Sequence, residues 1–141
     1  MHIRVVALLG TDSLRAAQLA EASGAQDRLW TFIARFFEHQ GPENSGYVTD
    51  AFLRTVAAEA GLDVDVAMAA RGSSVVDVRL RRNVQRWMRS SLTGTPAFLI
   101  GPASGTLQLF AGDDMRPSAI EGTIQRAMRE ARVLRASRRS G

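Results

Sequence analysis

Thr93-Gly94-Thr95-Pro96-Ala97-Phe98-Leu99-Ile100-Gly101 is the stretch of sequence that decides how the fold is interpreted. A loop of small residues ends at Pro96 and passes directly into a short apolar strand. Thr95 precedes a proline and is therefore biased toward extended backbone. Pro96 has no N–H to donate, so it belongs at the first residue of a strand or on a sheet edge. Both isomers stay open: a trans proline that opens a strand, or a cis Thr95–Pro96 bond that turns the Thr95 backbone toward an incoming chain.

The rest of the chain predicts an α/β arrangement around this stretch. Residues 3–9, a continuous β-branched and leucine-rich run, predict a buried strand. Phe98–Ile100 and 107–110 are joined by a glycine-containing connection, which predicts an antiparallel hairpin. Pro117 suits the first position of a final helix, for which a buried stripe is expected at Ile120, Ile124, Ala127, Met128 and Ala131.

Between residues 9 and 93 the hydrophobic periodicity predicts a block of five helices. Their expected bounds are about 13–23, 26–39, 49–60, 63–70 and 75–91. Asp12, Thr49 and Asp63 are predicted N-caps of the first, third and fourth helices. The second helix carries an expected core stripe at Leu29, Trp30, Ile33, Phe36 and Phe37.

Further segments carry a family resemblance in the same order along the chain: Asp12–Ala17, Arg28–Phe32 with Phe36-Phe37, and Ala58–Asp63. Together with the proline stretch they resemble the DsbA-like thiol-disulfide oxidoreductases, a branch of the thioredoxin fold. The resemblance covers roughly residues 3–130. It implies a thioredoxin-like domain over 1–134, with 12–92 as a helical insertion and 1–10 and 93–134 as the thioredoxin-like part, followed by a disordered basic tail at 135–141.

The resemblance assigns Thr95 and Pro96 to the cis-proline loop that holds a substrate peptide in this family. The family's Cys-x-x-Cys pair has no counterpart, because the 141-residue chain contains no cysteine. Disulfide exchange needs an attacking thiolate, so no catalytic residue is predicted and enzymatic activity stays an open question. We expect a truncated relative with a degenerate active site, which is redox-inactive and binds extended peptides at Thr95 and Pro96.

The missing segment also has a structural consequence. In DsbA-like proteins a first strand and the active-site helix precede the strand that corresponds to residues 3–9. The fold expected here is therefore an incomplete thioredoxin fold that lacks both elements. Residues 3–9 could pair directly with 97–100, a second copy could cover the gap, or Met1 could be an internal start in a longer gene product. Open strand edges invite pairing, so we expect a homodimer or marginal stability.

The net charge of +4 is carried by 18 arginines without any lysine. Arg79–Arg89 and the basic tail suggest an alternative function, a small nucleic-acid-binding module. Long charged side chains on a solvated helix face are more common, so nucleic acid is not an expected partner. A third possibility is a non-catalytic structural subunit that pairs through its strand edges.

Several classes of site and location are excluded by the sequence. His2 and His39 have no ligand spacing and thiolates are absent, so no metal is expected. No phosphate-binding or dinucleotide motif is present, so no cofactor is expected. The N-terminus lacks signal-peptide features and no apolar run reaches 18 residues. These features predict a cytoplasmic protein without a membrane partner.

Overall fold

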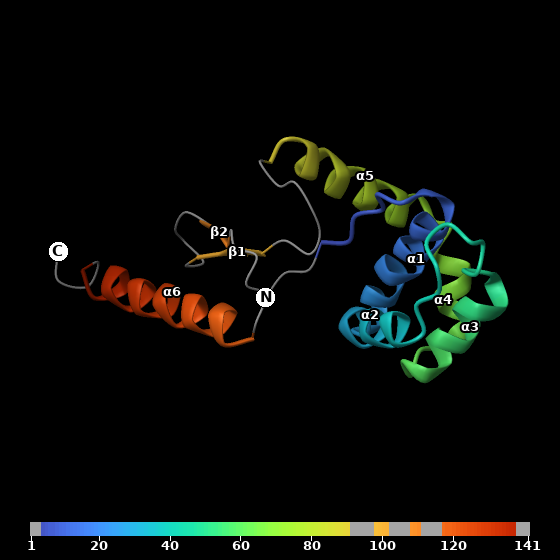
Figure 1. The fold of residues 1–141 in the computed structure, drawn as a ribbon, viewed down its shortest axis with the longest axis horizontal. Helices are drawn as coiled ribbons and strands as arrows, with labels where there is room; N and C mark the ends of the chain where they lie inside the picture. The colour runs from blue at the N-terminus through green and yellow to red at the C-terminus, as the bar shows by residue number, and fades with distance from the viewer. Residues whose placement is uncertain (1–3, 91–97, 102–107, 111–116, 138–141) are drawn as a thin grey trace. The chain divides into compact units, whose positions relative to one another are not determined.

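The computed structural model describes residues 4–90, 98–101, 108–110 and 117–137 (Figure 1). The chain forms two compact units, a helical unit over Met1–Ser91 and a C-terminal unit over Leu92–Gly141. The described residues are mostly helical, and their two strands form one sheet.

The helical unit contains the predicted block of helices. Its elements are α1 (Gly10–Ser23), the 3₁₀ turn η1 (Gly24–Gln26), α2 (Leu29–Glu38), α3 (Asp50–Glu59), α4 (Val64–Ala70) and α5 (Ser74–Met88). Thr49 and Asp63 are confirmed as N-caps, because their side chains accept hydrogen bonds from the N–H groups of Phe52 and Val66. Such caps satisfy amides that the first helical turn leaves unpaired.

The N-cap predicted at Asp12 is wrong. Helix α1 begins at Gly10, so Asp12 lies inside its first turn and is only 8% exposed. The Asp12 carboxylate accepts a hydrogen bond of 2.9 Å from the backbone N–H of Gly46. The carboxylate that was expected to cap the helix is therefore hydrogen-bonded to a loop 34 residues further along the chain.

Helix α1 is the centre of the helical unit, since it contacts α2, α4 and α5 (Figure 1). Its C-terminal half is buried on several sides, and most of the buried side chains there are small. Small side chains let neighbouring helix backbones approach closely, while larger ones from the surrounding helices fill the core. The largest fully buried apolar side chains are Phe32, Leu19, Leu53, Val48 and Val56.

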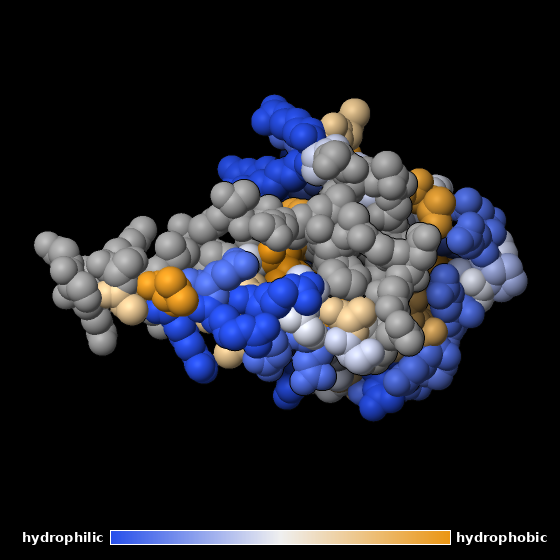
Figure 2. Space-filling view, turned by 60° about the vertical axis from the view of Figure 1, so that its left-hand side comes forward, coloured by the Kyte–Doolittle hydropathy of each residue, from blue (hydrophilic) through white to orange (hydrophobic). Residues whose placement is uncertain are grey.

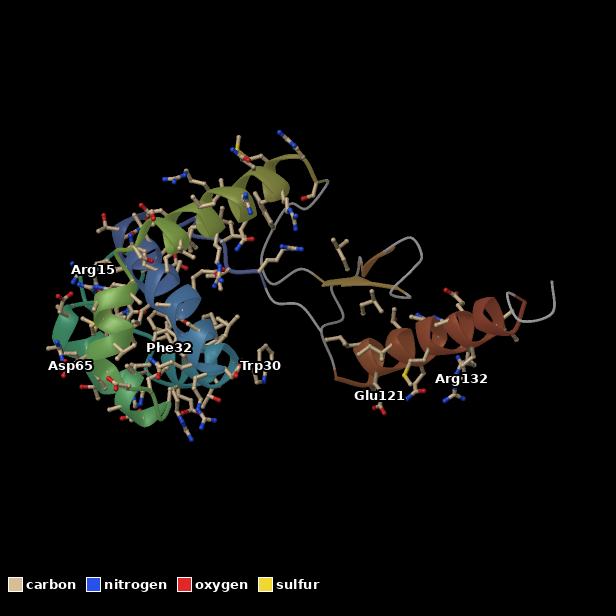
Figure 3. The ribbon with its side chains drawn as sticks, turned by 180° about the vertical axis from the view of Figure 1, so that it is seen from behind. Arg15, Trp30, Phe32, Asp65, Glu121 and Arg132 are labelled. Atoms are coloured by element: carbon tan, nitrogen blue, oxygen red, sulfur yellow. The ribbon has the colours of Figure 1, made fainter. Side chains whose placement is uncertain are left out.

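The core stripe predicted on α2 is shifted around the helix. Phe32 is 1% exposed, whereas Trp30 and Phe37 are each 61% exposed. Figure 3 shows Phe32 among the helices and Trp30 projecting away from them. At about 100° per residue, Trp30 and Phe37 lie roughly 140–160° around the helix from Phe32. The stripe was therefore wrong at these two positions, while Leu29, Ile33 and Phe36 pack against the core as predicted.

The structure also corrects the strand predicted over residues 3–9. Residues 4–9 form no ladder with any described residue and have no strand conformation. A strand requires a neighbour that pairs with its backbone groups. Here the carbonyl of Val5 instead accepts a hydrogen bond from the side-chain amide of Asn83. Val5 and Ala7 still pack against the helical core, but Leu8 and Leu9 are exposed.

The C-terminal unit contains β1 (Phe98–Ile100), β2 (Gln108–Phe110) and α6 (Pro117–Ser137). The hairpin is antiparallel as predicted, with Leu99 opposite Leu109. Helix α6 begins at Pro117 as predicted and includes residues 135–137 of the expected tail; residues 138–141 lie outside the described part. None of the helices described is long and apolar enough to span a bilayer.

The stripe predicted on α6 is not buried. Ile124 and Met128 are 43% and 47% exposed, and Ile120, Ala127 and Ala131 are half-buried. The reason is geometric, because α6 has 21 residues and is about 31 Å long. Each strand has three residues, which extend about 10 Å. The described hairpin is therefore too small to cover the apolar face of the helix.

Candidate functional site

The predicted peptide-binding residues, Thr95 and Pro96, lie outside the residues that the structure describes. What is described is the strand that follows them. Phe98 begins β1 two residues after Pro96, and its backbone is opposite Phe110 in β2. The predicted loop therefore leads directly into a paired strand, as the sequence indicated.

Strand β1 has one partner among the described residues, which is β2. The sheet order β1–β2 leaves the other edge of β1 without a described neighbour. The side chain of Leu99, at the middle of the strand, is 49% exposed. An edge strand of this kind presents backbone N–H and carbonyl groups that another extended segment can pair with.

A second candidate site is an open hollow of about 450 Å³ at the start of α1. It is lined by Gly10, Thr11, Asp12, Arg15, Asn44, Gly46, Val48 and Thr49. Gly10 has a φ of +69°, and a Cβ there would lie 2.1 Å from the Oδ1 of Asn44. This position therefore needs glycine, because a side chain would be strained and would collide with the loop that bounds the hollow.

The charged groups beside the hollow form an ion-pair network. Asp50 accepts hydrogen bonds from the guanidinium groups of Arg15 and Arg71, at 2.5 and 2.8 Å. The hydrogen bond from Arg71 is the main reason that the pKa of Asp50 lies below its ordinary value, and the positive charges of Arg71, Arg15 and Arg54 add to it against the opposing effect of desolvation. The Nε of Arg15 is buried and has no hydrogen-bond partner among the described residues.

The hollow has the composition of a structural junction and not of an acid–base site. Its lining contains neither a histidine nor a pair of neighbouring carboxylates. The carboxylate of Asp12 already accepts from Gly46, and that of Asp50 already forms ion pairs with two arginines. Nucleophilic catalysis needs a hydroxyl or thiol beside a base, and the carboxylate in the lining, that of Asp12, already accepts from the backbone N–H of Gly46.

A buried polar pair links α1 with α5. The side-chain amide of Asn83 donates to Oε1 of Glu21 at 2.9 Å and to the carbonyl of Val5 at 3.0 Å. Glu21 and Asn83 are each 8% exposed. Asn83 follows Val76 and Leu80 at helical spacing, so its position on the buried face could have been predicted from the sequence. Its hydrogen-bond partner Glu21, 62 residues away, could not be predicted in this way.

Histidine and carboxylate side chains elsewhere make ordinary pairs. His39 and Glu59 approach to 2.7 Å and join the ends of α2 and α3. Within the described part of the chain, no group of three histidine, aspartate or glutamate residues is arranged to hold a metal ion.

Comparison with known proteins supplies the family. The sequence model of the DSBA-like thioredoxin domain matches residues 2–125. No curated protein and no solved structure gives a significant match. The matched region includes most of both units, and the chain has none of the cysteines of a Cys-x-x-Cys pair. The chain belongs to the DSBA-like thioredoxin domain family.

Proposed function

We propose that this chain binds an extended peptide at Thr95–Pro96 and along β1, without exchanging disulfides. The observation that carries the proposal is the edge of β1, which follows the proline segment directly and has no second neighbour among the described strands. Strand addition to such an edge uses backbone hydrogen bonds for affinity and side-chain contacts for specificity.

The absence of cysteine supports the second half of the proposal. Thiol–disulfide exchange proceeds by attack of a thiolate on a disulfide sulfur. None of the 141 residues provides a thiol. A family member with this composition can retain the peptide-binding edge while it lacks the group that would react with a bound disulfide.

Pro96 defines where the peptide would stop. Proline has no N–H, so it cannot donate a ladder bond to an added strand. The residues on its C-terminal side, Phe98–Ile100, offer N–H and carbonyl groups in a paired conformation. We therefore place the peptide beside β1, with its pairing limited at Thr95–Pro96.

Peptide binding is tested by fluorescence anisotropy with labelled, cysteine-free peptides that are rich in β-branched residues. We expect Pro96→Ala to weaken binding at least roughly tenfold, because the conformation of the Thr95 backbone changes. Pro42→Ala is the matched control, since Pro42 lies in an exposed loop of the helical unit. Circular dichroism shows whether each variant is folded. Equal binding by the wild type and Pro96→Ala, or no binding by the wild type, overturns the proposal.

Redox inactivity is tested separately with a peptide that contains two cysteines. We expect its oxidation by glutathione disulfide to proceed at the same rate with and without the chain. A rate above the buffer control would contradict this half of the proposal and leave the peptide-binding half intact.

A second copy of the chain is the competing occupant of the same edge. Pairing of two β1 edges would produce a homodimer. Sedimentation equilibrium over a range of concentrations distinguishes the two cases: a monomer that binds peptide supports the proposal, and a dimer that excludes peptide replaces it with a structural role.

A further inference from the structure

Two stretches of this chain are strongly basic: residues 74–89, and residues 126–139 with six arginines and one glutamate. Residues 74–89, which are α5 and its C-cap, contain five arginines and one aspartate, a net charge of +4. The other 125 residues contain thirteen arginines and thirteen carboxylates and are therefore neutral as a whole. Within the helical unit, the 73 residues before α5 carry six arginines and nine carboxylates, a net charge of −3.

Four of these arginines share one face of α5. Arg79, Arg82, Arg86 and Arg89 follow one another at intervals of three, four and three residues, which places them along a single stripe. All four are exposed. The one ion pair recorded on α5 joins Arg81, which is off the stripe, to Asp77 at 4.0 Å. In the part of the chain that is described, the four residues of the stripe have no carboxylate partner.

The face of α5 next to the stripe is already occupied. Val76, Leu80 and Asn83 are buried, and α5 packs against α1. An amphipathic helix that lies in a membrane interface must insert its apolar face, and this face is not free to do so. The exposed surface of α5 carries the arginine stripe together with the exposed side chains of Val75, Val78 and Met88. Among the coloured residues in Figure 2, hydrophilic ones predominate, and hydrophobic ones form separate patches between them.

The stripe places like charges close together along α5, which has an energetic cost within the helix. Like charges three or four residues apart destabilise a helix. The helix dipole favours cations only in the last turn, which includes Arg86 and Arg89 but not Arg79 and Arg82. The C-terminal residues 92–141 carry seven arginines and four carboxylates, so they provide no excess negative charge to balance α5.

We propose that Arg79, Arg82, Arg86 and Arg89 bind the phosphate backbone of a nucleic acid. Guanidinium groups form bidentate hydrogen bonds with phosphate oxygens. The four residues extend about 15 Å along the helix axis, which is enough to contact several successive phosphates. Backbone contacts of this kind carry no sequence information. Binding is therefore sequence-independent, and it does not depend on the peptide edge.

The test uses the full chain with a labelled oligothymidylate and a labelled DNA duplex, in fluorescence anisotropy titrations at several salt concentrations. The stripe variant carries Arg79→Gln, Arg82→Gln, Arg86→Gln and Arg89→Gln. Glutamine and arginine have similar helix propensities, so the variant should keep the helical circular dichroism spectrum. The matched control loses the same charge at four exposed arginines outside α5, through Arg4→Gln, Arg28→Gln, Arg129→Gln and Arg132→Gln.

We expect the stripe variant to bind at least roughly tenfold more weakly at about 50 mM salt. The slope of log affinity against log salt should fall by about 3 for the single strand and about 4 for the duplex, as expected for the loss of four phosphate contacts. The control should keep most of the affinity and slope. The affinities for the two oligonucleotides show whether the chain prefers single-stranded or duplex DNA.

Three results would overturn the proposal. The first is no binding of either oligonucleotide by the wild type at low salt. The second is an equal loss in the stripe variant and the control, which would show an effect of net charge alone. The third is binding to vesicles of anionic phospholipid as tight as to the oligonucleotides, with the same dependence on the stripe, which would replace nucleic acid by a lipid surface.

Discussion

The two units of this chain bury their apolar side chains to very different extents. In the helical unit, Phe32 and Leu19 are 1% and 0% exposed, whereas Ile124 and Val133 on α6 are 43% and 69% exposed. The family match includes most of both units. The difference in burial shows that an amphipathic pattern places apolar residues on one face, but burial depends on how much neighbouring surface exists to cover that face.

Core truncation is expected to have the largest effect. Phe32→Ala should lower the free energy of unfolding by about 3–5 kcal/mol, because it removes a fully buried ring and leaves a cavity. Ile124→Ala on α6 should cost about 1 kcal/mol or less, since much of that side chain is already in water. Urea denaturation followed by circular dichroism measures both.

Phe37→Ala provides the control for residue type, because Phe37 is in the same helix as Phe32 but is 61% exposed. It should lower the free energy of unfolding by well under half as much as Phe32→Ala does. If Ile124→Ala proved as damaging as Phe32→Ala, the stripe on α6 would be covered in solution and the contrast between the units would fail.

Removal of the buried amide should have the next largest effect. Asn83→Ala leaves the carboxylate of Glu21 without its hydrogen-bond donor and should cost about 1–3 kcal/mol. It should also speed amide hydrogen exchange in residues 4–9, since the Val5 carbonyl loses the same donor. Gln85→Ala, at an exposed position of the same helix, is the control and should change stability by less than about 0.5 kcal/mol. Equal stability of the two variants would show that the hydrogen bonds of Asn83 to Glu21 and Val5 do not stabilise the fold.

The ion-pair network should give the smallest effect and a pH dependence of defined sign. The folded-state pKa of Asp50 is lowered, chiefly by its hydrogen bond from Arg71. Its contribution to stability is therefore present above the ordinary aspartate pKa, about 3.9, and is lost as pH falls below that value. Asp50→Asn should lower the melting temperature slightly at pH 7, because exposed ion pairs contribute little, and by less at pH 3.

Glu43→Gln serves as the comparison for Asp50→Asn, because Glu43 has no ion pair recorded in the described part of the helical unit. It should be neutral at both pH values. A difference between Asp50→Asn and the wild type that persisted unchanged at pH 3 would mean that the carboxylate does not act through its charge.

Features that depend on nearby residues were predictable from the sequence. Thr49 and Asp63 cap helices whose first amides are three residues away. Pro117 begins α6, and the hairpin has the predicted pairing. In each case the residue that determines the structure and the group that responds to it are within a few positions of one another, or within one short connection.

Features that depend on distant partners were not predictable. Asp12 was expected to cap α1, but the N–H of Gly46 takes its carboxylate. Residues 3–9 have the composition of a strand and still form none over 4–9, because composition does not supply a neighbouring strand. The same distinction holds for the candidate sites. Thr95 and Pro96 were identified from the sequence alone, whereas the exposed face of α5 could be identified only once its packing against α1 was known.

The position of the helical core in the sequence has a consequence for synthesis. Every buried apolar residue of that core lies before Leu80 or is Leu80 itself. Translation at roughly 5–20 residues per second takes about 3–10 seconds to add the 50 residues after Ser91. Helical domains rich in local contacts fold in microseconds to milliseconds. We therefore expect the helical unit to be folded on the ribosome before the hairpin and α6 have emerged, so that the last third of the chain is made after the helical core is complete.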